Sequence, residues 1–273
     1  MPTGRPVTIP ESLAGPNARG RTVSSAAVAG IDVGGTGIKG APVDVGKGAL
    51  AADRFRLPTP RPATPTAVAD TIAQVLDHLG VDGPVGCTVP GPVQRGLVHQ
   101  APNLSPSWHN LDAEKLLRKR LSRPVRLLND ADAAGLAEAH FGAAQDIHGV
   151  VVLVTLGTGI GTAIVAHGQL VPNTELGHLR MGKSEAEKRA SNEARLEQGL
   201  SWKKWGARVS AYLQELERLL WPDLFVVGGG VSKKFDKFGH RLHTRTPVVP
   251  AELGNQAGIV GAALHANSAA SSA

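Results

Sequence analysis

The fold is decided by residues 27–45, AVAGIDVGGTGIKGAPVDV, in which an apolar run meets a cluster of glycines and continues as a second apolar run. Short apolar runs bounded by glycine are typical of β-strands, so this stretch predicts a strand, a tight glycine turn and another strand. The same device returns at residues 150–166, VVVLVTLGTGIGTAIVA. Because both halves of the chain open with this unit, the sequence predicts a duplicated fold.

Outside these two units, apolar stretches with helical spacing alternate with short buried runs, which predicts an α/β fold with much parallel pairing. The predicted strands are 27–33, 38–45, 85–89, 125–128, 150–156, 162–166 and 224–227, and the predicted helices are 67–79, 111–121, 131–141, 183–220 and 258–265. We expect a small N-terminal lobe (27–128), a larger C-terminal lobe (129–250), a C-terminal helix returning to the small lobe (251–265), and flexible tails (1–26 and 266–273).

Composition narrows the class of protein. The 273 residues include one cysteine, Cys87, which excludes an internal disulfide and favours a reducing cytoplasm. No stretch approaches the roughly 20 apolar residues that span a bilayer, and the first residues lack an apolar signal core. Residues 181–245 hold 13 Lys/Arg against 8 Asp/Glu, a basic excess that suits either a solvated helix surface or a phosphate-rich partner.

Two familiar nucleotide motifs are present but stand in the wrong context. Residues 35–40 match the G-x-G-x-x-G dinucleotide fingerprint, yet Pro42 and the β-branched residues around it predict a strand where that fingerprint needs a helix. Residues 177–184 match the Walker A pattern, but residues 172–176 before them do not form the strand that such a loop should leave. Both matches are interpreted as accidents of spacing.

Three glycine turns that each follow a predicted strand carry the functional argument. They lie at residues 32–36 (DVGGT), 156–159 (LGTG) and 227–230 (VGGG). Glycine lets backbone N–H groups approach phosphate oxygens closely, and the threonines add hydroxyl donors. Three such turns on a duplicated plan predict a phosphate-binding site.

These turns resemble the phosphate loops of sugar kinases that share a two-lobed, ribonuclease H-like fold with actin and hexokinase. The pair Asn129-Asp130 before an alanine-rich helix, together with residues 175–178 (ELGH), resembles the sugar site of the ROK family of repressors and sugar kinases. The likeness runs from about residue 27 to residue 265. Residues 170–178, 200–205 and 221–234 resemble the polyphosphate-using glucokinases of actinobacteria.

The resemblance implies a central cleft with assigned side chains. It makes Asp130 the general base that takes the proton of a sugar hydroxyl, and Asp32 the residue that holds Mg²⁺ through water. The implied sugar contacts are Asn103, Asn129, Asp130, Glu175, His178 and the turn at Gly91. The implied phosphate and nucleotide contacts are Asp32, Gly34, Gly35, Thr36, Gly37, Lys39, Gly157, Thr158, Gly159, Gly228, Gly229 and Gly230.

Several of these residues have a structural alternative that the sequence leaves open. Asp130 suits the N-terminal cap of the following helix, and Asn103 suits a loop held by an Asx turn. His178 suits a hydrogen-bonded core position, Asp32 a turn at a strand end, and Lys39 a solvated strand face.

The sequence also departs from the family. Many ROK proteins bind zinc through cysteines after the Glu-x-Gly-His motif, whereas residues 179–197 contain none, so no zinc site is expected and His178 is free to face the sugar. Residues 1–26 are too short for the winged helix-turn-helix of the repressor members, so no nucleic-acid partner is expected. The family resemblance implies a homodimer.

We therefore expect a glucokinase that uses polyphosphate or ATP, with mannose as a further acceptor. Polyphosphate could lie along lysines of the basic region, namely Lys183, Lys203, Lys204, Lys233 and Lys234. The alternatives are an ATP-only kinase of another hexose or amino sugar, and a sugar-sensing regulator without catalysis.

Overall fold

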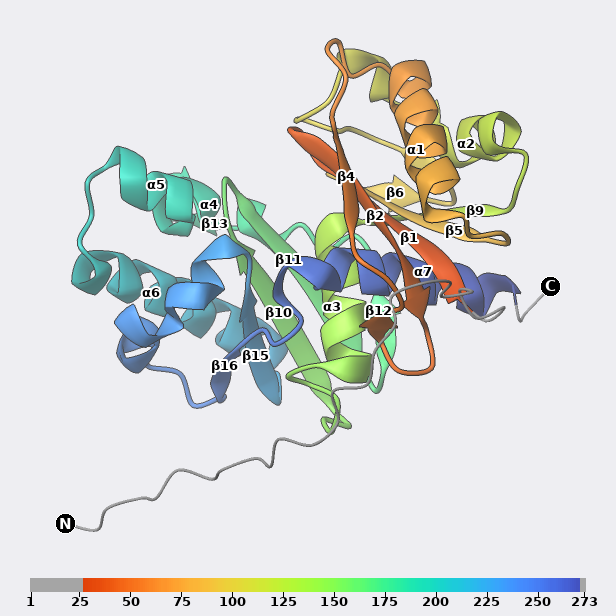
Figure 1. Ribbon diagram of the computed structural model, residues 1–273. Helices are drawn as coiled ribbons and strands as arrows, with labels where there is room; N and C mark the ends of the chain where they lie inside the picture. Colours follow the sequence, from red (N-terminus) through yellow and green to blue (C-terminus); the bar gives the residue numbers. More distant parts are fainter. Residues whose placement is uncertain (1–26, 271–273) are drawn as a thin grey trace, which may run out of the picture.

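The chain forms two α/β lobes, shown side by side in Figure 1. The computed structural model describes residues 27–270. The expected N-terminal tail at 1–26 lies outside the described residues, whereas the C-terminal helix extends to Ala270, so residues 266–270 of the other expected tail are helical. In the part of the chain that is described, no helix combines the length and apolarity that crossing a bilayer requires.

The small lobe is built on a six-stranded sheet. Its strands run in the order β3-β2-β1-β5-β9, and β4 pairs with β2 at the outer edge. Strand β1 pairs antiparallel with β2 and parallel with β5. The strands are β1 (Ala27–Val33), β2 (Gly37–Asp44), β3 (Ala49–Leu50), β4 (Phe55–Pro58), β5 (Val85–Val89) and β9 (Val125–Asn129).

The large lobe repeats this plan in a five-stranded sheet with the order β12-β11-β10-β15-β16. Strand β10 pairs antiparallel with β11 and parallel with β15, as β1 pairs with β2 and β5. The strands are β10 (Val150–Leu156), β11 (Ile160–Ala166), β12 (Gln169–Val171), β15 (Leu224–Gly228) and β16 (Val248–Pro250). The duplication predicted from the two strand–turn–strand units is confirmed.

Smaller elements decorate both lobes. A three-stranded sheet holds β6 (Val93–Gln94), β7 (Leu97–Val98) and β8 (Leu111–Asp112), and a two-stranded one holds β13 (Arg180–Met181) and β14 (Ser184–Glu185). Single 3₁₀ turns are η1 (Pro106–Trp108), η2 (Leu176–His178), η4 (Gly239–Arg241) and η5 (Gly254–Gln256), and η3 (Gly230–Lys237) is longer.

Helix ends follow their capping residues. Helix α1 (Pro65–Leu79) starts after Thr64, whose side chain accepts a hydrogen bond from Ala67 N, and ends at Gly80 in the left-handed conformation. Helix α2 (Ala113–Leu121) starts two residues later than predicted because the Asp112 side chain caps it.

The single long helix predicted at 183–220 is wrong. The segment contains α4 (Glu187–Ala190), α5 (Asn192–Glu197) and α6 (Trp202–Leu220). Ser191 and Ser201 each cap a new helix, and Gly199 has a φ of 58° that helical backbone does not allow. Apolar residues recur on both sides of these breaks because α4 and α6 bury residues in the same core of the large lobe.

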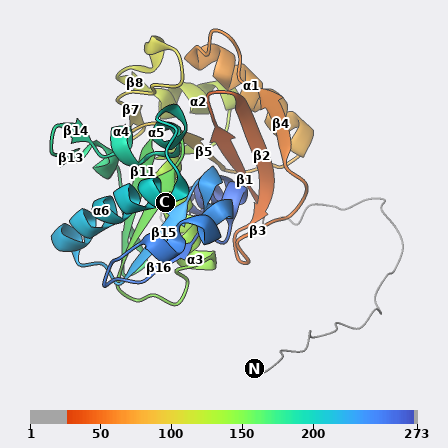
Figure 2. The same ribbon diagram turned by 90° about the vertical axis from the view of Figure 1, so that its left-hand side faces the viewer.

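Two helices lie between the sheets and join the lobes (Figure 1). Helix α3 (Asp130–Phe141) leads from β9 toward the large lobe, and α7 (Ala257–Ala270) packs against α3, β1 and β5. The approach is close: a Cβ on Gly86 would lie 1.8 Å from the carbonyl oxygen of Ala262, and a Cβ on Gly261 would lie 1.8 Å from that of Ala133. Figure 2 shows the small-lobe strands and α6 on opposite sides of the molecule.

Candidate active site

Asp32 lies where parallel strands of the small lobe end. Strands β1 and β5 place Asp32 directly beside Thr88, whose hydroxyl donates a hydrogen bond of 3.0 Å to Asp32 Oδ1. The Lys39 ammonium of β2 forms an ion pair of 3.1 Å with Oδ2. Both carboxylate oxygens therefore have a fixed orientation at the carboxyl edge of the sheet, the usual position of sites in α/β folds.

The first glycine turn connects β1 to β2, so a strand and not a helix follows it. This confirms that the dinucleotide fingerprint at residues 35–40 lacks the helix that it needs. Gly34 N donates to Gly37 O at 3.0 Å, which closes the turn and leaves Thr36 exposed. A Cβ on Gly35 would lie 3.1 Å from Cβ of Asn103. The fold thus places Asn103, a predicted sugar residue, against the predicted phosphate turn.

The second and third glycine turns follow β10 and β15, which are parallel neighbours. Gly157 N donates to Gly159 O at 3.0 Å, and Thr158 between them is exposed. Gly229 has a φ of 79°, and a Cβ there would lie 3.0 Å from backbone atoms of Leu156. The two turns are therefore packed against each other at the carboxyl edge of the large-lobe sheet.

The pair Asn129-Asp130 joins β9 to α3. The Asn129 side-chain oxygen accepts hydrogen bonds from Ala131 N at 2.8 Å and Asp132 N at 3.1 Å, so Asn129 is the N-terminal cap. The sequence left open whether Asp130 caps this helix, and the structure shows that Asn129 does so instead. Asp130 begins the helix and accepts a hydrogen bond of 2.8 Å from Ala131 N.

Asp130 has the electrostatics of a base. Its residue keeps access to solvent, yet surrounding protein atoms desolvate the carboxylate enough to raise its pKa from 3.8 to about 6. The negative charges of Asp32 and Glu175 add to the rise, and the Ala131 N–H opposes it. Asp130 is therefore ionised at neutral pH and more basic than an ordinary aspartate.

Asp132 and Asn173 together hold the loop that leads to Glu175. Asp132 is fully buried, its Oδ2 accepts a 2.7 Å hydrogen bond from Asn173 N, and burial raises its pKa to about 7. The Asn173 side chain accepts from Val93 N at 2.7 Å and donates to Val93 O at 2.9 Å. The loop that leads to Glu175 is thus fastened to α3 and to the small-lobe segment beyond Gly91.

Gly91 shapes that segment. Its φ is 150°, and a Cβ there would lie 2.0 Å from the carbonyl oxygen of Gln100. No other residue fits this close approach without a shift of the loop.

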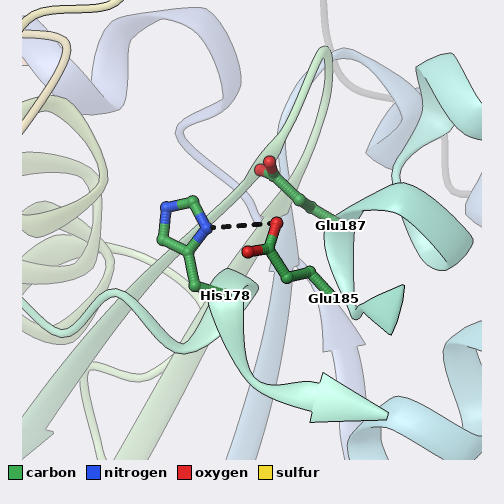
Figure 3. A group of neighbouring side chains, drawn as sticks. All are labelled: His178, Glu185 and Glu187. Atoms are coloured by element: carbon green, nitrogen blue, oxygen red, sulfur yellow. Dashed lines mark ion pairs between the residues drawn. The ribbon is translucent and has the colours of Figure 1, made fainter. Parts of the chain in front are cut away.

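Glu175 directly precedes η2, and His178 is the last residue of η2. Figure 3 shows His178 close to two carboxylates, Glu185 and Glu187. His178 Nδ1 lies 3.7 Å from Glu185 Oε2, and one ligand atom from each of His178, Glu185 and Glu187 lies within 4.8 Å of the others. Burial and the charge of Glu187 raise the pKa of Glu175, and His178 lowers it. His178 is exposed, so the core alternative for this residue is wrong.

Glu187 also contacts the second glycine turn. Its Oε2 would lie 2.7 Å from a Cβ on Gly159, and it accepts a long hydrogen bond of 3.5 Å from Ile160 N. Glu187 therefore connects the residues predicted to hold sugar with a turn predicted to hold phosphate. It was missed in the sequence because residues 183–220 were assigned to one continuous helix.

Thr88 and Asn173 were also missed. Thr88 could have been found, since it stands near the carboxyl end of a strand predicted to run parallel to the strand of Asp32. Asn173 gave no such signal, because its partners are the backbone of a residue 80 positions away and a buried helix side chain.

The chemistry of the donor set fits Mg²⁺. Asp32 offers oxygen ligands of the kind that Mg²⁺ prefers, and the nearby Asp130 adds negative charge that a cation would offset. Because Thr88 and Lys39 already engage both Asp32 oxygens, contact through water suits this carboxylate better than direct coordination.

The predicted lysines do not gather around the glycine turns as a group. Lys233 lines a surface hollow with Arg54, next to the third turn, whereas Lys203 and Lys204 lie at the start of α6. Lys183 lies in the turn between β13 and β14, and Lys234 lies within η3.

The sequence is similar to those of known proteins. The model of the ROK family matches residues 28–201. The polyphosphate glucokinase of Mycobacterium tuberculosis strain CDC 1551 is 51% identical over 236 residues, which cover 86% of this chain and 89% of the relative.

Solved structures agree as well. The crystal structure of the inorganic polyphosphate/ATP-glucomannokinase from Arthrobacter sp. strain KM superposes with a TM-score of 0.84 at 50% identity, covering 89% of this chain and 99% of that one. A ROK family glucokinase from Streptomyces griseus, solved with glucose and AMPPNP, gives a TM-score of 0.76 at 27% identity, with coverage of 89% and 99%. The two-lobed fold of actin and hexokinase is thereby confirmed, and the chain belongs to the ROK family.

Proposed function

We propose that the chain transfers a phosphoryl group from inorganic polyphosphate or ATP to the 6-hydroxyl of glucose. The main support for the proposal is the position of Asp130. Its carboxylate has a raised pKa, and the negative charges of Asp32 and Glu175 contribute to that rise. The identity of 51% to a polyphosphate glucokinase supports the choice of donor and acceptor.

Asp130 supplies the base that the reaction needs. A sugar hydroxyl is a weak nucleophile, so its oxygen attacks the terminal phosphorus while Asp130 takes its proton. One P–O bond forms, and the bond to the bridging oxygen breaks. The products are glucose 6-phosphate and ADP, or a polyphosphate shortened by one unit. A pKa of about 6 keeps the base ionised at neutral pH without making it too weak to hold a proton.

The sugar hydroxyls need partners that both donate and accept. We assign that role to Asn103, the free amide hydrogens of Asn129, Glu175 and His178, with Gly91 shaping the segment opposite them. Glu187 joins them because its charge acts on Glu175. The name of the Arthrobacter enzyme supports mannose as a further acceptor.

The glycine turns hold the donor. The backbone N–H groups of the first and second turns would contact the phosphoryl groups, and the third turn would lie beside the nucleoside of ATP. Mg²⁺, held through water at Asp32, would offset the charge that develops on the transferred phosphoryl group.

The remaining assignments concern the whole chain. We propose a homodimer on family grounds, which the mass of the purified protein in solution tests. The cytoplasmic location rests on the single cysteine, Cys87, which is fully buried and has a pKa raised by burial to about 12. We assign no zinc site of the cysteine-based kind, because residues 179–197 contain no cysteine.

A coupled assay of glucose 6-phosphate formation tests the proposal. Polyphosphate, ATP and pyrophosphate are compared as donors, and glucose, mannose and N-acetylglucosamine as acceptors. We expect turnover of glucose with both polyphosphate and ATP. Turnover confined to ATP, or to an amino sugar, would contradict the assignment.

A further inference from the structure

Residues 54–61 hold three exposed arginines without a carboxylate partner, and two of them contact the first glycine turn. Arg56 donates a 2.9 Å hydrogen bond to Thr36 O, and Arg61 donates a 3.0 Å bond to Gly35 O. Arg54 donates to the carbonyl of Asn255 at 3.3 Å. Between residues 27 and 270, none of the three forms an ion pair. Six other arginines do, namely Arg118, Arg120, Arg123, Arg126, Arg218 and Arg245.

The strand register places these charges in line with the reaction centre. Asp32 of β1 is directly opposite Lys39 of β2, and Lys39 is directly opposite Arg56 of β4. Directly paired residues lie on one face of a sheet, so the three form a row from Asp32 to the sheet edge. Asp32 offsets the charge of Lys39, whereas Arg56 has no carboxylate partner between residues 27 and 270, so a bound anion would supply the missing counter-charge.

The row continues into a hollow. Arg54 comes directly before β4, and its guanidinium reaches the Asn255 carbonyl just before α7. Arg54 and Lys233 line a surface hollow of about 800 Å³, together with the amides Asn255 and Gln256 and one carboxylate, Asp53. Positive groups therefore extend from the first glycine turn, along β4, to the third-turn side of the large lobe.

We propose that the part of a polyphosphate chain beyond the transferred phosphoryl group lies along this path, from Arg61 and Arg56 to Arg54 and Lys233. The inference rests on the proposed donor. Each guanidinium carries five N–H groups and uses one on a backbone carbonyl, so the others are free for phosphate oxygens. A linear polyanion carries about one charge per phosphate unit, so successive units could each contact one cation of the row. ATP has only three phosphates, and these would end near the glycine turn.

This path replaces the one predicted from the basic residues of the sequence, apart from Lys233. Figure 2 shows β4 and α6 on opposite sides of the molecule, so the arginine path begins on the side away from α6. The sequence concealed the arginine path because residues 54–61 lie outside the stretch where basic residues accumulate.

Steady-state kinetics with long-chain polyphosphate and with tripolyphosphate test the path. Arg54→Glu removes a charge that only the longer donor reaches. We expect the KM for the long chain to rise roughly threefold to tenfold relative to that for tripolyphosphate. The slope of log KM against log salt for the long chain should fall by about one. Arg56→Gln should raise the KM of both polyphosphates.

Lys119→Glu is the matched control, because it makes the same charge change at an exposed residue of α2. The path is overturned if Arg54→Glu and Lys119→Glu have the same KM ratio, or if only Lys203→Glu and Lys204→Glu change it. Equilibrium binding of the same polyphosphate separates the path from the proposed function. If the wild type makes no glucose 6-phosphate, weaker binding by Arg54→Glu still supports the path, and unchanged binding overturns it.

Discussion

At the scale of single residues, the raised pKa of Asp130 predicts that the rate of the proposed reaction depends on pH. Its pKa of about 6 is raised mainly by burial, and only the ionised form can take a proton. We therefore expect kcat/KM for glucose to rise as pH increases through about 6 and to level off above it. A pH profile of initial rates checks this, and a flat profile between about pH 5 and pH 8 would contradict it.

Asp132 should show its effect in stability. Burial holds its pKa near 7 in the folded protein, whereas the unfolded chain releases the same proton near pH 4. The stability that this group contributes is therefore present in acid and is lost as pH rises through 7. Asp132→Asn keeps an oxygen for Asn173 N and has no proton to lose. Relative to the wild type, its free energy of unfolding should increase as pH rises.

Denaturant titrations at several pH values between about 5 and 8 measure that difference. The charge of Asp130 helps to raise the Asp132 pKa, so the comparison measures the titration of Asp132 together with that coupling. If the two stability curves run parallel across this range, burial does not hold a proton on Asp132.

At this scale the sequence indicated candidate site residues more readily than the residues that hold them in place. The glycine turns and the Asn129-Asp130 pair stand in short motifs, and the fold places them at facing strand ends. Glu187, Asn173 and Arg56 have no motif, because each acts on a residue that only the tertiary structure brings near it.

Among the elements, α7 depends on glycines in the strands it crosses. A Cβ on Gly86 would lie 1.8 Å from the Ala262 carbonyl oxygen, and backbone cannot yield as a flexible side chain does. We expect Gly86→Ala to lower the free energy of unfolding by about 1–3 kcal/mol or more. Gly46→Ala, at an exposed turn where the nearest atom is 3.4 Å away, is the control. The measurement is the midpoint temperature of thermal unfolding. If it is the same for the two variants, α7 shifts to accommodate the added methyl group without a loss of stability, which contradicts this prediction.

Strands were predicted more accurately than helix boundaries. The apolar runs 27–33, 85–89 and 150–156 coincide with strands of the structure, because their burial on both sides leaves one continuous apolar signal. The helix predicted from residue 183 is too long. Its apolar spacing indicated one continuous helix, although Ser191 and Gly199 interrupt the helical segment.

At the scale of the whole molecule, the Asn173 side chain links the loop before Glu175 to Val93 of the small lobe. It makes two hydrogen bonds to Val93, each worth roughly 1 kcal/mol. Asn173→Gly removes them without straining a backbone whose φ is 62°. We expect the KM for glucose to rise about tenfold while kcat changes less. An unchanged KM would show that the loop of Glu175 holds its place without this link.

The duplicated architecture was predictable because each half carries its own strand–turn–strand unit. The meeting of the two halves was not, since it depends on α3, α7 and single side-chain bridges that leave no periodic pattern. The division of the chain at residues 128 and 250 stays a prediction.

The most direct test is glucose 6-phosphate formation by the purified protein with polyphosphate and Mg²⁺, measured beside Asp130→Asn. The substitution keeps the size of the side chain and removes the base, so we predict turnover in the wild type and a loss of about 10²–10⁴-fold in the variant. Retained glucose binding by the variant, seen as a thermal shift, would show that the site is intact. Equal turnover by the two proteins would contradict the role of Asp130, and no turnover by the wild type would contradict the proposed function.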